Sequence, residues 1–391
     1  MDAALPDAAA LAEQARAATG LEDLGEGGWR DGLERLVASL REEGRLSELG
    51  RQIAGAELRG YLETRLRLVE WRRQHPELGK ADVTPPIVIV GQGRTGTTIL
   101  HDLLAQDPAH RVPLTWEVDR PLPPPETATY ESDPRIAEVQ ARQDAIDQIL
   151  PAFRAMHPMG AKLAQECVRI TAGDFRSMIF PTQYRVPSYA DWLVHEADMA
   201  PAYRWHRFSL EHLQSRHAAP RWVLKSPGHI WCLGALLAEY PNALLVQTHR
   251  DPLRILASLA SLVATLRRLA SEQSSIPETA SEWAERILDG LDRSVAARED
   301  GTLPARRVVD VHFGAFMADP LATIRGIYER FGLELTREAE ARMRRFHAEH
   351  PADQHGGHRY RFADTGLDEG ALRERARRYQ RYFDVPSEPL P

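Results

Sequence analysis

A glycine-rich segment is the first part of the chain whose residue types could do chemistry. Gly91-Gln-Gly-Arg-Thr-Gly-Thr-Thr98 follows the β-branched run Ile87–Val90 and precedes an apolar, helix-like stretch. Backbone amides in such a turn, with the positive end of the following helix dipole, bind phosphate-like anions. The spacing from Gly91 to Gly96 is that of an NTPase P-loop, but Thr97 stands where the P-loop lysine belongs. Arg94 is the cation offered instead, which argues against an ATPase or GTPase.

Three more polar residues, two of them at the ends of predicted strands, come further along the chain. Lys225 ends the strand-like Trp222–Lys225, and Arg250 follows the strand-like Ala243–Thr248. Ser258 comes eight residues after Arg250, inside a predicted helix. Lysine is seldom buried, so a strand-end lysine beside a Ser-Pro-Gly turn favours a place in a cleft.

These motifs resemble those of the PAPS-dependent sulfotransferases, and of their bacterial branch in particular. That family has Lys or Arg, then Ser or Thr, then Gly-Thr-Thr after a strand, as in Gly93–Thr98 here, and an Arg followed eight residues later by a Ser, as in Arg250 and Ser258. The resemblance implies a cytoplasmic enzyme that moves the sulfuryl group of PAPS to a hydroxyl and releases PAP. It implies that Arg94 and Lys225 stabilise the transferring charge. It also implies these donor-binding residues: Arg94, Thr95, Gly96, Thr97 and Thr98 for the 5′-phosphosulfate, with Arg250 and Ser258 for the 3′-phosphate.

Two residues are candidates for the general base that must take the acceptor's proton. Glu117 lies shortly after the predicted helix that follows the glycine-rich loop 91–98, here called the phosphate loop. Some branches of the family place a glutamate there. His229 is the alternative, because other branches use a histidine after the lysine of the second strand. In those branches the histidine comes two residues after the lysine, whereas His229 comes four residues after Lys225. We therefore favour Glu117.

The family also closes a glycine-containing basic loop over the 3′-phosphate and the adenine. Gln354-His-Gly-Gly-His-Arg-Tyr-Arg361 is the candidate here, with Gly357 and Arg359 as donor-binding residues. It departs from the best-known Arg-Lys-Gly form of the loop. Because the sulfuryl group carries a single negative charge, side-chain cations can serve without Mg²⁺, and we predict no metal.

The acceptor is predicted to be a small apolar alcohol or phenol, because aromatic residues and methionines gather between residues 150 and 215. Two other functions remain open. One is a P-loop-like nucleotide kinase with an altered loop, and the other is a module that binds PAP without turnover.

The elements that must position these residues alternate as strand and helix. The strand-like runs 87–90, 222–225, 243–248 and 308–312 are each followed by a turn and a predicted helix, which indicates a mainly parallel α/β sheet. We predict a P-loop-like three-layer α/β domain over residues 85–391, with a helical acceptor-site insertion at about 120–220. Residues 1–84 are predicted as a helical N-terminal extension, which either covers the core of one subunit or pairs two subunits in a homodimer.

The composition of the chain excludes several classes of protein. Lys+Arg number 49 and Asp+Glu 56, a net charge of −7, so no overall basic field would attract nucleic acid. Only 2 cysteines occur, which excludes a disulfide framework and fits a reducing compartment. No apolar run approaches the ~18–20 residues that a membrane span needs, and the beginning of the sequence does not read as a signal peptide.

Overall fold

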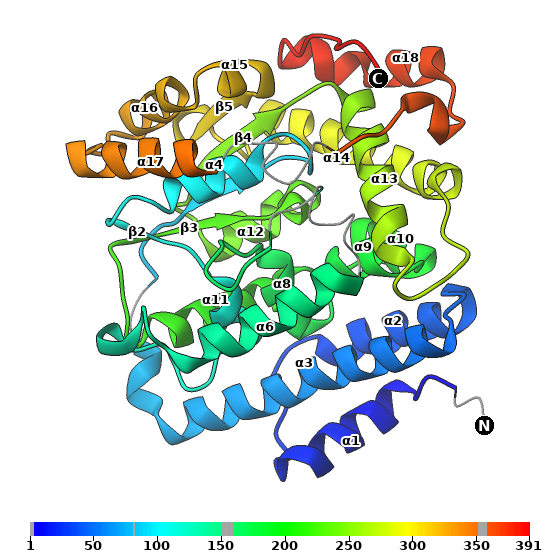
Figure 1. Ribbon diagram of the computed structural model, residues 1–391, viewed down its shortest axis with the longest axis vertical. Helices are drawn as coiled ribbons and strands as arrows, with labels where there is room; N and C mark the ends of the chain where they lie inside the picture. The colour runs from blue at the N-terminus through cyan, green and yellow to red at the C-terminus, as the bar shows by residue number, and fades with distance from the viewer. Residues whose placement is uncertain (1–3, 81–82, 150–155, 157–158, 351–357) are drawn as a thin grey trace.

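The computed structural model describes residues 4–80, 83–149, 156, 159–350 and 358–391. At its centre lies a parallel five-stranded sheet in the order β2-β3-β1-β4-β5 (Figure 1). The strands are β1 Ile87–Val90, β2 His110–Arg111, β3 Arg221–Lys225, β4 Leu244–His249 and β5 Val308–His312.

The central strands are apolar on both faces. Because successive side chains of a strand point to opposite faces, helices pack on both sides of the sheet and the fold has three layers. Ile87 and Ile89 point to one face, where they pack with α4 (Thr97–Leu104), α16 (Pro320–Phe331) and α17 (Arg337–Glu349). Val88 and Val90 point to the other face, where they pack with α11 (Ala200–Gln214) and α12 (Leu233–Glu239). A run of β-branched residues is therefore stable only between helices, as expected for a parallel strand.

Three helices precede the sheet: α1 Ala8–Thr19, α2 Trp29–Glu43 and α3 Glu48–Gln74. They lie at the lower edge of the molecule in Figure 1 and share one apolar cluster with helices from residues 168–295. Arg65 of α3 is buried in this region and donates to Leu24 O at 2.6 Å and to Gly173 O at 3.0 Å. These contacts join the N-terminal helices to the body of the protein, while the boundary at residue 84 stays a prediction.

Short helices fill the chain between β2 and β3: α5 Thr115–Asp119, α6 Pro134–Ile149, α8 Cys167–Thr171, α9 Ile179–Gln183 and α10 Pro187–His195, before α11. Beyond β4 the longer helices are α13 Pro252–Arg267 and α14 Ile276–Glu299, and after β5 come α15 Phe313–Ala318, α16, α17 and α18 Glu369–Tyr382. The α/β fold class predicted from the sequence is confirmed. Within the described residues, the strand that the prediction missed is β2.

Candidate active site

The carboxyl ends of three neighbouring strands bring the predicted residues together. β1 pairs in parallel with β3 on one side and with β4 on the other. The loop 91–96 after β1, Lys225 at the end of β3 and Arg250 just after β4 therefore meet at one edge of the sheet. In open α/β sheets this edge is where ligands bind.

The loop after β1 owes its shape to residues with positive φ. Gly91 has φ +134°, and a Cβ there would lie 2.4 Å from the Thr248 hydroxyl of β4, so only glycine fits. Gly96, with φ +85°, caps the N-terminus of α4. Thr95 is buried, its hydroxyl donates to Gln92 O at 2.6 Å, and it lies 2.7 Å from the Thr248 hydroxyl. The loop is thus fastened to both strands, with α4 starting at Thr97 and Thr98.

Arg94 crosses from this loop to α13. Its Nε donates to the Ser258 hydroxyl at 2.8 Å, and its Nη1 donates to Met156 O at 2.8 Å. Burial lowers the pKa of Arg94 below its usual value. The two residues that the sequence assigned to different phosphate groups, Arg94 and Ser258, are therefore direct neighbours.

Arg250 binds the backbone of the same loop. Its Nη1 donates to Arg94 O at 3.0 Å, and its guanidinium carbon lies 3.9 Å from the centre of the Phe313 ring. Its Nε and Nη2 donate to the two carboxylate oxygens of Glu388, each at 3.0 Å. This partner was not foreseen from the sequence, since Glu388 lies 138 residues further along the chain.

Lys225 is 1% exposed, and its ammonium group lies between a hydroxyl and a carboxylate. Nζ donates to the Thr98 hydroxyl at 3.2 Å and forms an ion pair with Glu166. Glu166 is the residue before α8, and its side chain is 20% exposed. The lysine thus joins the phosphate loop to a carboxylate that sequence reasoning missed, because nothing in the spacing of Glu166 marks it.

Glu117 has a different set of partners. It is fully buried at the start of α5, where one carboxylate oxygen accepts from Leu114 N at 2.9 Å and the other pairs with Arg111 of β2. This is the helix-capping arrangement in which a glutamate at the third helical position binds the cap residue's backbone. Leucine at the cap position has no side chain that could bind the helix, so the sequence lacks the usual Ser/Thr-x-x-Glu signature that would have indicated this role.

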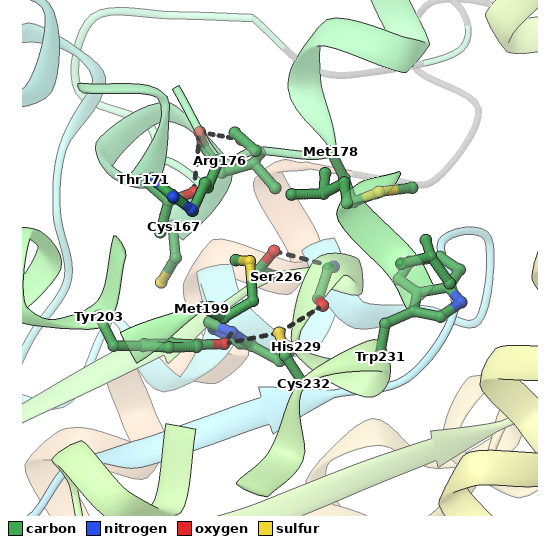
Figure 2. A pocket seen from close by; sticks show the side chains of 15 residues that line it. Cys167, Thr171, Arg176, Met178, Met199, Tyr203, Ser226, His229, Trp231 and Cys232 are labelled. Atoms are coloured by element: carbon green, nitrogen blue, oxygen red, sulfur yellow. Dashed lines mark hydrogen bonds between the residues drawn. The ribbon is translucent and has the colours of Figure 1, made fainter. Parts of the chain in front are cut away.

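His229, in the 3₁₀ helix η4 (Pro227–Trp231), lines a cavity of about 30 Å³ together with Cys167 and Ser226 (Figure 2). Its Nδ1 lies 2.7 Å from the Tyr203 hydroxyl, and its buried Nε2 has no hydrogen-bond partner among the described residues. Burial lowers the pKa of His229 to about 3, so the ring is neutral at pH 7. The apolar part of the cavity lining is Val168, Met178, Leu193, Val194, Met199 and Trp231.

The predicted basic loop is only partly described. Gly357 lies outside the described residues, and Arg359 is exposed. His358 lies inside instead, with Nε2 3.0 Å from the Ser261 hydroxyl and Nδ1 3.3 Å from Arg94 Nη2. Burial, with Arg94 beside it, lowers the pKa of His358 to about 4. A neutral histidine thus reaches the Arg94–Ser258 contact from this segment.

The described residues offer neither a cluster of metal ligands nor a membrane-spanning helix. Across residues 4–350, apart from the undescribed gaps, and 358–391, no cluster of three His, Cys, Asp or Glu side chains could hold a metal ion. In the same part of the chain no helix is long and apolar enough to cross a membrane.

A three-layer α/β fold, with a glycine loop and cations at three neighbouring strand ends, defines a P-loop-like protein. Residues 85–337 match the model of the sulfotransferase family, and the chain belongs to that family. Sulfotransferase STF9 from Mycobacterium avium is similar over 98% of each chain, with 32% identity and a TM-score of 0.89. Sulfotransferase STF1 from Mycobacterium tuberculosis H37Rv is 33% identical over 95% of this chain and 98% of that one, with a TM-score of 0.83. The omega-hydroxy-beta-dihydromenaquinone-9 sulfotransferase Stf3 of Mycobacterium bovis is 26% identical over 280 residues, which are 68% of this chain and 67% of that protein.

Proposed function

We propose that the protein transfers the sulfuryl group of PAPS to a hydroxyl of a small apolar acceptor and releases PAP. The observation that carries the proposal is the meeting of Arg94, Ser258 and Arg250 around the phosphate loop, with the Lys225–Glu166 pair at Thr98. Loop amides and Thr97 and Thr98 would hold the 5′-phosphosulfate, and Arg250 with Ser258 would hold the 3′-phosphate. This leaves Lys225 at the sulfuryl end of the donor.

The reaction is an in-line displacement. The acceptor oxygen forms a bond to sulfur while the bond from sulfur to the 5′-phosphate oxygen breaks, and the electron pair of that bond leaves with PAP. Lys225 and Arg94 would stabilise the charge that grows on the bridging oxygen, as cations do in phosphoryl transfer. A carboxylate or histidine must take the hydroxyl proton.

We propose Glu166 as that base, in preference to Glu117 and His229. Glu166 contacts Lys225 and is partly exposed, so an acceptor can reach it. Glu117 holds the start of α5 and pairs with Arg111, and the lowered pKa of His229 makes its ring a weak base. His229 would instead bind the acceptor through Nε2, which lacks a partner among the described residues.

A relative, rather than the size of the cavity, supports an apolar acceptor. The cavity of about 30 Å³ has room for little more than the reacting hydroxyl, and its lining mixes apolar side chains with Thr171, Arg176 and Ser177. Ser226 and Cys167, the chain neighbours of Lys225 and Glu166, open onto it (Figure 2). The Mycobacterium bovis relative is named for a hydroxylated menaquinone. Like the acceptor proposed here, that molecule carries a hydroxyl on an apolar body. Long-chain and isoprenoid alcohols are therefore the first acceptors to test.

The donor is tested by thermal unfolding of the purified protein with PAP and a chelator, and separately with ATP and Mg²⁺. A ligand at a hundredfold excess over its Kd should stabilise the fold by about 2.7 kcal/mol. We expect a shift with PAP. A shift with ATP and Mg²⁺ alone would contradict the proposal and favour a nucleotide kinase.

The base is tested by Glu166→Gln, with Glu117→Gln as the matched variant. We expect E166Q to keep PAP affinity and to lose about 100-fold or more in sulfuryl transfer, the range for removing a general base. E117Q should keep most of the transfer rate and lose stability, since its carboxylate partners are structural. The reverse pattern would make Glu117 the base. If the protein binds PAP but transfers sulfuryl to no hydroxyl, it is a module that binds PAP without turnover.

A further inference from the structure

The segment after α18 places a carboxylate on the arginine that the donor needs. Glu388 takes both the Nε and the Nη2 hydrogen bonds of Arg250, at 3.0 Å each. A carboxylate in this two-point geometry occupies the edge of a guanidinium that also recognises phosphate. A third donor, Nη1, is already bound to Arg94 O. Little of Arg250 is left for a second anion.

The backbone of the segment, rather than the carboxylate, fixes it in place. Glu388 N donates to Asp251 Oδ2 at 2.6 Å, and Arg254 Nη1 donates to Pro389 O at 3.0 Å. Leu390 packs beside Leu253 of α13. The side chain of Glu388 can therefore change partner while its main chain stays bound.

A second partner for the carboxylate is present. Arg254 Nε lies 3.5 Å from Glu388 Oε2, and the Arg254 side chain is 21% exposed. If a phosphate took the Nε and Nη2 edge of Arg250, Glu388 would still have Arg254 to pair with.

We propose that Glu388 is a specificity-determining residue of the donor site, an internal anion that the nucleotide's 3′-phosphate displaces from Arg250. The proposal rests on the assignment of Arg250 to the 3′-phosphate made under the proposed function. Its consequence is that the carboxylate weakens the binding of PAP and PAPS relative to what Arg250 alone would give. The carboxylate acts on the 3′-phosphate only, so nucleotides that lack this group are unaffected.

The test is calorimetric binding of PAP and of AMP, which lacks the 3′-phosphate, to the full chain and to Glu388→Gln. We expect E388Q to bind PAP about tenfold more tightly, because a competing charge-assisted pair is removed, and to bind AMP as the unmodified protein does. Glu374→Gln on α18 is the matched control, since Glu374 pairs with Arg377 and should leave both affinities unchanged. Glu388→Ala repeats the test in case the glutamine side chain makes new contacts, and unfolding without ligand confirms that each variant is folded.

Unchanged or weaker PAP binding by both E388Q and E388A would overturn the proposal. Weaker binding would mean that the carboxylate holds Arg250 in place for the phosphate. Arg250→Ala separates this failure from failure of the proposed function. If R250A loses the preference for PAP over AMP while E388Q changes nothing, only the role of Glu388 is wrong. If R250A binds PAP like the unmodified protein, the 3′-phosphate assignment itself fails.

Discussion

Lys225 and Glu166 show how a charge can be kept in a nearly closed site. An ammonium group that is withdrawn from water is stable only when it is paired and hydrogen-bonded. Glu166 and the Thr98 hydroxyl supply both conditions. The same pairing puts an acid-base group beside the phosphate loop, so structural need and proposed chemistry coincide in one contact.

Gly91 carries the tightest steric constraint in the phosphate loop. Gly91→Ala should lower the free energy of unfolding by about 2 kcal/mol or more, because a Cβ would strain the backbone and meet Thr248. PAP affinity should fall with it, as the loop moves. Urea unfolding and calorimetry measure the two effects.

Gly326→Ala is the control for that change. Gly326 lies inside α16, and a Cβ there would meet nothing within 4 Å. Alanine should raise helix stability there by up to about 1 kcal/mol. Equal effects of the two substitutions would show that the loop is not constrained as described.

Some site residues could be predicted and others could not, for a physical reason. Arg94 stands at a fixed place in the loop between β1 and α4, and Arg250 and Ser258 stand at a fixed spacing in the unit of β4 and α13, where local geometry limits what a residue can reach. Glu166 and Glu388 reach the site from other parts of the fold, so only the packing of α8 and of the segment after α18 places them. Glu117 was chosen by its distance along the chain, which carries no information about its ion pair with Arg111.

At the scale of elements, Asp251 organises the start of α13. Its carboxylate accepts from Leu253 N at 2.9 Å, pairs with Arg373 of α18 and accepts from Glu388 N. Asp251→Ala should lower the free energy of unfolding by about 3 kcal/mol or more, since it removes a helix cap and takes from the partly buried Arg373 its fully buried partner.

Asp319→Ala provides the comparison. Asp319 also precedes a proline and caps its helix, accepting from Ala322 N at 2.9 Å, but it is exposed. Its loss should cost about 1 kcal/mol. A loss of the same size at Asp251, measured by urea unfolding, would show that the contact with α18 contributes little.

The bounds of some strands could be predicted from the sequence, and those of others could not. The strands 87–90 and 308–312 have the bounds that were predicted, because β-branched runs are strong local signals. β2 is His110–Arg111 alone, too short for any periodicity, and it is a strand only because Arg221 and Trp222 of β3 lie beside it.

Across the whole molecule, buried histidines make the fold sensitive to acid. Burial lowers the pKa values of His101, His206 and His229 to about 3. Below pH 6.5 the unfolded chain binds protons at these positions that the folded chain does not, so the stability contributed by these three histidines is full above pH 6.5 and is lost as the pH drops towards 3. Burial raises the pKa of Asp102 to about 7, which acts in the opposite direction, so the histidine share is measured as a difference between variants. At pH 5.5 each histidine should cost about 1.4 kcal/mol relative to pH 7.5.

Urea unfolding at the two pH values measures this loss. His206→Asn should reduce the difference in the free energy of unfolding between pH 7.5 and pH 5.5 by about 1.4 kcal/mol, the contribution of one histidine. This holds whatever the substitution does to stability at pH 7.5. His347→Asn, at an exposed position, should leave the difference as it was. A difference that H206N does not reduce would contradict the burial argument.

The order of strands in the sheet also has a consequence for how the chain is made. β1 lies between β3 and β4, yet residues 91–220 separate it from β3. During synthesis the first strand must wait for both of its neighbours, and contacts so distant in sequence are slow to form. A ribosome-bound chain that ends before residue 225 has the glycine loop but neither Lys225 nor Arg250. The proposed donor site is therefore incomplete until residue 250 has been synthesised, so its nucleotide would stabilise the finished protein and not the first half of the chain as it emerges.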